Sequence, residues 1–152
     1  MELLKLLTDQ KDDIVSKATE HTRFDGLKHY QSESIHVITE RLAPLMDVFL
    51  TSLKERNVIP MVEYSETVAR DRFSQGYPLD EVIAAYNILE EQLWETVKEQ
   101  QHVDRQADNF SIISRIMGAG KTALADAYLS STSSSKKKAL LIDKLFGGTD
   151  GV

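Results

Sequence analysis

Hydrophobic residues along this chain recur with the period of an α-helix, and few residues interrupt the pattern. Apolar side chains return three, four and seven positions apart in each long segment, as on the buried face of an amphipathic helix. Only three prolines and seven glycines occur in 152 residues. No stretch alternates between apolar and polar residues in the way that marks a strand. The pattern therefore predicts an all-α fold.

Turn signals divide the pattern into helices. Asp25 and Gly26 mark a first turn within a polar stretch, and Gly76 suits the position that follows a helix. Pro60 and Pro78 suit first helical positions. We expect a bundle of five main helices, over about residues 2–20, 32–56, 60–75, 78–102 and 104–130.

Pro44 lies inside the second of these helices. Proline lacks the backbone N–H and clashes with the preceding turn, so we expect a kink there, or two short helices that meet. Such a break would replace the regular up-down arrangement, and globin-like helix crossings are the alternative architecture.

The composition changes after Ser130. Residues 130–135 are all serine or threonine and three lysines follow, which is typical of a flexible, basic linker. Residues 139–146 have the pattern of a short amphipathic helix, which Gly147 and Gly148 would end. We expect a helical domain over residues 1–130 and a tail over residues 131–152. So short a helix is unstable alone, and would pack on this domain, a second copy or a partner.

Composition excludes several classes of function. The net charge is −6, so the chain has no general attraction for nucleic acid or anionic lipid. There are no cysteines, which removes disulfides, thiolate metal sites and cysteine nucleophiles, and suits a reducing cytoplasm. No apolar run reaches membrane-spanning length, and the first residues lack the layout of a signal peptide. We expect a cytoplasmic domain without nucleic-acid or membrane partners.

Two Glu-x-x-His pairs raise the hypothesis of a di-metal oxidase. Glu33 with His36, and Glu99 with His102, have the spacing found in di-iron helical bundles. The first pair lies near the start of its helix and the second near the end of another that runs the same way. The rise per residue then separates the pairs by about 28 Å. We therefore expect no metal site and keep the oxidase as a weak alternative.

Residues 117–122 end like a phosphate-binding loop, with Gly120 before Lys121 and Thr122. Arg115 stands where the first glycine of that loop is required, and no strand precedes the segment. The small residues 118–120 are better explained by the close approach of a neighbouring helix, and they are a candidate site of flexibility.

Four aromatic residues are candidates for lining a ligand cavity, although aromatic residues at helical spacing more often belong to a core. A haem-type sensor would need an inward-facing axial ligand, and none of the four histidines falls on an apolar stripe. We therefore expect no cofactor, and a small-molecule or haem-type ligand sensor remains the alternative function. The candidates are Tyr86, Trp94, Phe110 and Tyr128.

The most distinctive stretch is residues 68–86, which joins the third and fourth expected helices. It resembles the N-terminal domains of RsbT co-antagonist (RsbRD-type) regulators and related N-terminal domains of bacterial sensor kinases. The resemblance extends over about residues 10–131. The residues that carry it are Arg72, Gly76, Tyr77, Pro78, Leu79, Glu81 and Tyr86.

The resemblance implies a helical sensory or regulatory module for signal transduction in a bacterial stress response. It carries over no catalytic residues, so we expect a domain that is not an enzyme. It implies a protein partner, such as an output kinase or regulator, and we expect a homodimer. Domains of this kind precede a regulatory domain or a kinase, so the chain would either be the sensing part of a longer protein or act through its tail.

Overall fold

The computed structural model describes residues 2–24 and 28–146, and these residues fold entirely into helices and their connections. The all-α prediction is confirmed. Seven helices occur in this part of the chain: α1 (Glu2–Asp9), α2 (Lys11–Phe24), α3 (Lys28–Gln31), α4 (Ile35–Glu55), α5 (Ile59–Ser74), α6 (Leu79–Gln100) and α7 (Val103–Phe146).

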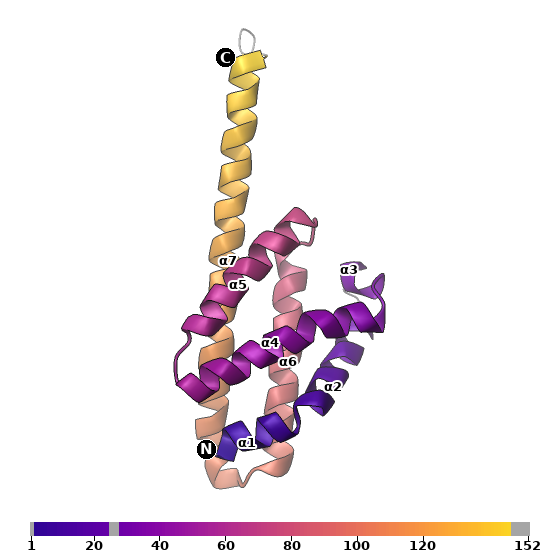
Figure 1. The fold of residues 1–152 in the computed structure, drawn as a ribbon, viewed down its shortest axis with the longest axis vertical. Coiled ribbons are helices and arrows are strands. Elements are labelled where there is room, and N and C mark those ends of the chain that lie inside the picture. Colours follow the sequence, from indigo (N-terminus) through magenta and orange to yellow (C-terminus); the bar gives the residue numbers. More distant parts are fainter. Residues whose placement is uncertain (1, 25–27, 147–152) are drawn as a thin grey trace.

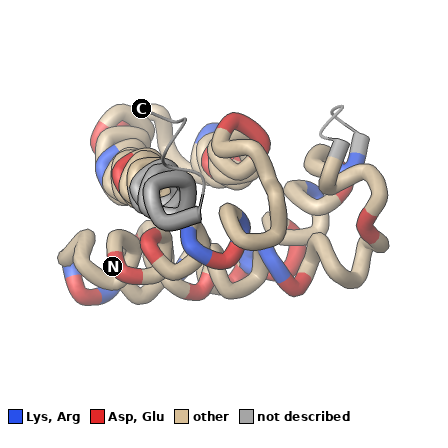
Figure 2. Tube along the Cα trace, turned by 90° about the horizontal axis from the view of Figure 1, so that it is seen from above, with Lys and Arg blue, Asp and Glu red and all other residues tan. Residues whose placement is uncertain are grey.

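Two long antiparallel helices, α6 and α7, form one side of the molecule, and α4 and α5 cross over them (Figure 1). Helix α7 packs chiefly against α5 and α6, while α2 packs between α4 and α6. Seen from above, Asp and Glu are interspersed with Lys and Arg around the described helices (Figure 2).

The apolar stripes of the long helices meet in one core. The largest fully buried side chains come from separate helices and include Phe49, Met61, Leu89 and Met117. Burial of each such side chain contributes roughly 1.5–3 kcal/mol relative to leaving it in water. The core therefore holds α4, α5, α6 and α7 together and fixes where their polar residues lie.

The predicted count of five helices is too low, for local reasons. A turn at Gln10 separates α1 from α2, and the polar stretch after Gly26 contains the short helix α3. Pro44 lies within a single helix, α4, instead of between two. The carbonyl that loses its partner there belongs to Glu40, which is exposed, so water can satisfy it.

The prediction of a linker after Ser130 is also wrong, because α7 continues without a break to Phe146. No glycine or proline occurs between Lys121 and Phe146. Serine lowers helix propensity by only about half a kcal/mol and lysine is a good helix former. The last part of α7 extends beyond the other helices (Figure 1). The expected stop at Gly147 and Gly148 lies outside the described residues.

No described helix is long and apolar enough to cross a membrane.

Candidate functional site

The turn between α5 and α6 carries the residues that mark the distinctive stretch. Gly76 has φ +82°, a conformation that only glycine adopts without steric cost, so it ends α5 sharply. The Tyr77 N–H then donates to the carbonyl of Arg72 at 3.0 Å. Pro78 has extended backbone (φ −66°, ψ 145°) immediately before α6 begins. This geometry turns the Tyr77 side chain into the molecule, where it is buried.

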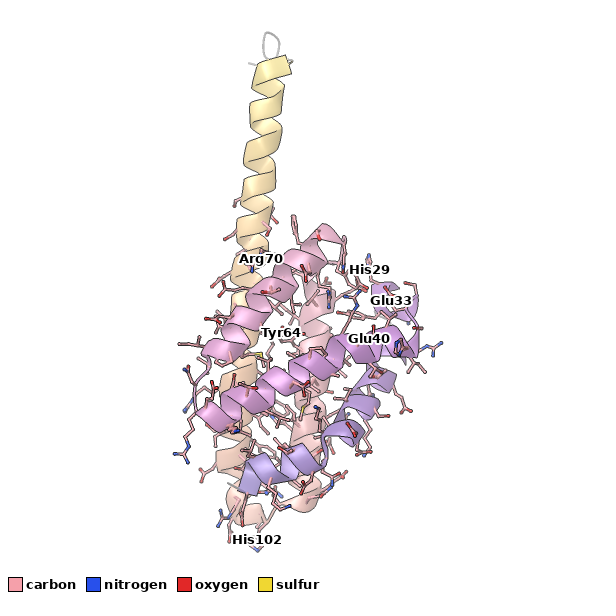
Figure 3. The ribbon with its side chains drawn as sticks, in the orientation of Figure 1. His29, Glu33, Glu40, Tyr64, Arg70 and His102 are labelled. Atoms are coloured by element: carbon pink, nitrogen blue, oxygen red, sulfur yellow. The ribbon has the colours of Figure 1, made fainter. Side chains whose placement is uncertain are left out.

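Hydrogen bonds tie this turn to three other segments. The Tyr77 hydroxyl donates to Glu33 Oε1 at 3.0 Å, and the Tyr128 hydroxyl of α7 donates to the Tyr77 carbonyl at 3.0 Å. Glu81 of α6 accepts from the backbone N–H of His29 at 3.1 Å and its carboxylate also contacts the His29 ring. His29 of α3 and Glu33, in the connection between α3 and α4, lie at one end of the bundle (Figure 3). The turn therefore joins the α3 region to α7.

Two arginines from different helices lie against the Tyr77 ring. The guanidinium carbon of Arg41, from α4, is 5.6 Å from the ring centroid, and that of Arg72, from α5, is 5.9 Å away. Arg72 is only 8% exposed. The Nε atoms of both arginines are buried without a hydrogen-bond partner. Within the described residues, neither arginine forms an ion pair with a carboxylate.

The contacts around the two arginines do not fully offset the cost of burying their charges. Burial of an ion costs several kcal/mol, and an uncompensated like charge nearby adds to that cost. A cation–π contact returns only about 0.5–2 kcal/mol. The contacts with the Tyr77 ring therefore offset only part of the cost of placing Arg41 and Arg72 together. A counter-charge would stabilise the site further.

Both arginines border a small cavity of about 10 Å³ between α4, α5 and α6. That volume is enough for roughly one water-sized occupant. We call the site the arginine–tyrosine cavity and define it by the polar side chains that line it, with apolar residues of α4, α5 and α6 completing the wall. These polar residues are Tyr30, Arg41, Tyr64, Arg72 and Tyr86.

Burial makes the tyrosine hydroxyls of this region harder to ionise. It raises the pKa of Tyr30, Tyr64 and Tyr86, although the charge of Arg72 opposes the rise. Burial raises the pKa of Tyr77 and Tyr128 to about 12 each, helped at Tyr77 by the bond to Glu33. Neutral hydroxyls can donate hydrogen bonds, so at neutral pH the cavity offers donors and positive charge.

These shifts predict loss of stability in alkali. Unfolded tyrosine ionises near pH 10, whereas Tyr77 and Tyr128 ionise near 12 in the fold. A raised pKa of the folded form stabilises the protein fully below pH 10, and the stabilisation is lost as the pH rises from 10 to 12. We expect tyrosinate absorbance to rise above pH 10 together with loss of helical circular dichroism. A titration in urea is the control, and tyrosinate that forms near pH 10 without unfolding would contradict the prediction.

The four predicted cavity residues do not gather in one place. Tyr86 lines the arginine–tyrosine cavity, where its hydroxyl is 2.9 Å from Ser65 Oγ. Tyr128 is buried edge-on to Phe73, with ring centroids 5.7 Å apart. Trp94 and Phe110 pack against each other elsewhere, with centroids 6.3 Å apart, and Trp94 is 37% exposed. A ligand role for these residues stays a prediction.

The two Glu-x-x-His pairs lie at opposite ends of the bundle, as Glu33 and His102 show in Figure 3. His36 pairs with Glu40 at 3.0 Å and His102 with Asp104 at 3.3 Å, both on the surface. Among the described residues, no three His, Asp or Glu side chains converge as metal ligands do.

The histidines also bear on a haem-type site. His21, His36 and His102 are exposed, and His29 is half-buried against Glu81. All four lie within the described residues, and none of them lines the arginine–tyrosine cavity.

A second, larger groove of about 310 Å³ lies between the α4–α5 turn and α7. Leu53, Val58 and Ile116 are among its lining residues, and its two arginines, Arg56 and Arg115, are exposed. Water solvates these charges, so the groove lacks the unpaired buried polar atoms of the arginine–tyrosine cavity.

Sequence reasoning missed Tyr30, Arg41 and Tyr64 as site residues. The available signal was the position of Arg41, three residues after Ile38 and beside Leu42 on the apolar stripe of α4. A cation at such a position has to lie at the edge of the core. The convergence of Arg41 with Arg72 depends on the crossing of α4 over α5, which the sequence pattern does not specify.

Comparison with protein families finds a match to the RsbT co-antagonist protein rsbRD N-terminal domain, over residues 12–131. The match covers α2 to α6 and the part of α7 that packs in the bundle. Curated proteins and solved structures give no match. Family members are regulatory signalling domains and are not known as enzymes. The earlier resemblance is thereby confirmed, and the chain belongs to the RsbT co-antagonist protein rsbRD N-terminal domain family.

Proposed function

We propose that this chain is a non-enzymatic, cytoplasmic signalling domain that passes an input through helix repacking to a protein partner or an output domain. One observation carries the proposal: a single helix, α7, is bonded to the turn between α5 and α6 and also extends beyond the bundle (Figure 1). The same helix therefore contacts the α5–α6 turn, beside the arginine–tyrosine cavity, and presents a surface outside the bundle.

The proposed path runs from the arginine–tyrosine cavity to α7 in two contacts. Tyr77 lies under both arginines and its carbonyl accepts the Tyr128 hydroxyl of α7. Helix α5, which carries Arg72, also approaches α7 closely at Gly120. An input that moves α5 or the turn therefore shifts α7. The input shifts α7 only if it binds one packing of the helices more tightly than the other.

We further propose that α7 pairs with α7 of a second copy. The extended part stands clear of the other described helices in Figure 1. A helix without tertiary contacts is marginal in water, so pairing would stabilise it. Leu129, which is 65% exposed, lies at the base of this part.

Cysteine cross-linking tests the pairing, because the chain has no cysteine of its own. We expect Leu129→Cys to form disulfide-linked dimers under mild oxidation. Val103→Cys, 71% exposed at the other end of α7, is the matched control and is expected to stay monomeric. Native mass spectrometry of the unmodified chain is expected to give a dimer at the polypeptide mass. A monomer that forms no cross-link at Leu129 would overturn the proposed pairing of α7.

The second candidate function is a sensor with a bound organic or haem-type ligand. The arginine–tyrosine cavity supports ligand binding in general, but its volume of about 10 Å³ is too small for haem without rearrangement. The same native mass spectrum separates the two candidates, because excess mass that survives purification would favour the second.

A further inference from the structure

The arginine–tyrosine cavity lacks a counter-charge within the described chain. Only 8% of the Arg72 surface is exposed, and the Nε atom of this residue has no hydrogen-bond partner. The Nε of Arg41, on the facing helix, is in the same state. A guanidinium group is charged at any pH the protein meets, so neither arginine can relieve the cost by losing a proton.

Two carboxylates of this region are already engaged. Glu33 accepts the Tyr77 hydroxyl, and Glu81 holds the backbone and ring of His29. Neither carboxylate forms an ion pair with Arg41 or Arg72 in the described part of the chain. No described carboxylate is therefore paired with either guanidinium group, and a group from solution could take that place.

We propose that the arginine–tyrosine cavity binds a small monovalent anion of about the size of chloride. This proposal depends on the proposed function in one respect: it takes this anion to be the input that the signalling domain receives. The cavity volume of about 10 Å³ accepts a single atom of water size, which a halide approximates and a tetrahedral oxyanion exceeds. Two guanidinium groups and protonated tyrosines supply N–H and O–H donors on several sides.

Anion binding would change how the helices are held. In the structure, Arg41 of α4 and Arg72 of α5 share the Tyr77 ring. An anion between the two guanidinium groups links α4 to α5 by charge-assisted hydrogen bonds, which are stronger than neutral ones. The link acts on α5 and on Tyr77, the two elements through which α7 is contacted.

A titration of the full chain with sodium chloride tests the site. The ionic strength is held constant with gluconate, which is too large for the cavity, and binding is followed by thermal unfolding and by chloride NMR line broadening. We expect a saturable rise in the unfolding midpoint, with bromide acting like chloride. We expect Arg41→Gln and Arg72→Gln each to weaken binding by at least about tenfold, which is about 1.4 kcal/mol.

Arg70→Gln is the matched control, since Arg70 is an exposed arginine of α5 that donates to Thr67 (Figure 3). It removes the same charge from the same helix, so it is expected to bind chloride with wild-type affinity. If Arg72→Gln fails to fold, the half-buried Arg41→Gln carries the test. In gluconate alone, Arg41→Gln is expected to be at least as stable as the wild type, because it removes an uncompensated charge.

Three results would overturn the anion site: no saturable effect of chloride or bromide, an equal effect in all three arginine variants, or saturable binding of phosphate alone. The cross-linking of Leu129→Cys is independent of these measurements. A chain that binds chloride and does not cross-link would leave the anion site standing and would overturn the proposed pairing of α7.

Discussion

Replacing Gly120 by alanine is expected to lower the free energy of unfolding by about 1–3 kcal/mol, the cost typical of an overpacked core. A Cβ at this position would lie 2.9 Å from both Cγ and Sδ of Met61, and 3.0 Å from Ser65 Oγ. Met61 is fully buried in α5, so it has little space to move. Alanine also raises helix propensity by about 1 kcal/mol, and we expect the steric cost to exceed this gain.

Gly118→Ala is the matched control for this variant. It lies two residues away on the same helix, and a Cβ there meets no atom within 4 Å. We expect it to raise stability by up to about 1 kcal/mol through propensity alone. Urea denaturation of the two variants measures the difference directly. Equal stabilisation by both would show that α5 does not press on α7 at Gly120, and would remove that contact from the proposed path.

The two glycines also show what the sequence could and could not predict here. The run Gly118-Ala119-Gly120 correctly predicted a close helix approach, because small residues in a helix carry a propensity cost that packing has to offset. The pattern could not say which glycine faces the neighbour. That depends on the rotation of α7 against α5, which the whole core decides.

The long helices and the turn at Gly76 were predictable because their signals are local. Glycine with positive φ, proline at a helix start and a seam of apolar residues all act within a few positions. The continuity of α7 was missed because a run of Ser and Lys is compatible both with a linker and with a helix, and composition alone does not decide between them.

The candidate site was predicted only in part. Arg72, Tyr77, Glu81 and Tyr86 were identified by their resemblance to a family pattern, and the structure brings them together around the α5–α6 turn. Arg41 comes from a helix distant in sequence, and its partner in the cavity is set by tertiary packing. A single sequence holds no direct record of such a pairing.

Removal of Lys121 is expected to have the second large effect, because it holds a buried carboxylate. Lys121 Nζ of α7 lies 2.9 Å from Glu90 Oε1 of α6 and also donates to Asn87 Oδ1 at 2.8 Å. The Glu90 side chain is 8% exposed and that of Lys121 is 25% exposed. Lys121→Met leaves the Glu90 carboxylate buried without its cation. We expect a loss of about 2–3 kcal/mol, below the 3–5 kcal/mol of a fully buried pair because of that exposure.

The double variant Glu90→Gln with Lys121→Met is expected to recover most of the lost stability, since no charge is then left buried. A surface pair supplies the control: Lys5→Met removes the partner of Asp9, and we expect a change below about 0.5 kcal/mol. The same geometry argues against a phosphate-binding loop at residues 117–122. The segment is helical and Lys121 already has a carboxylate partner. If Lys121→Met cost no stability, water would have to reach Glu90 between α6 and α7.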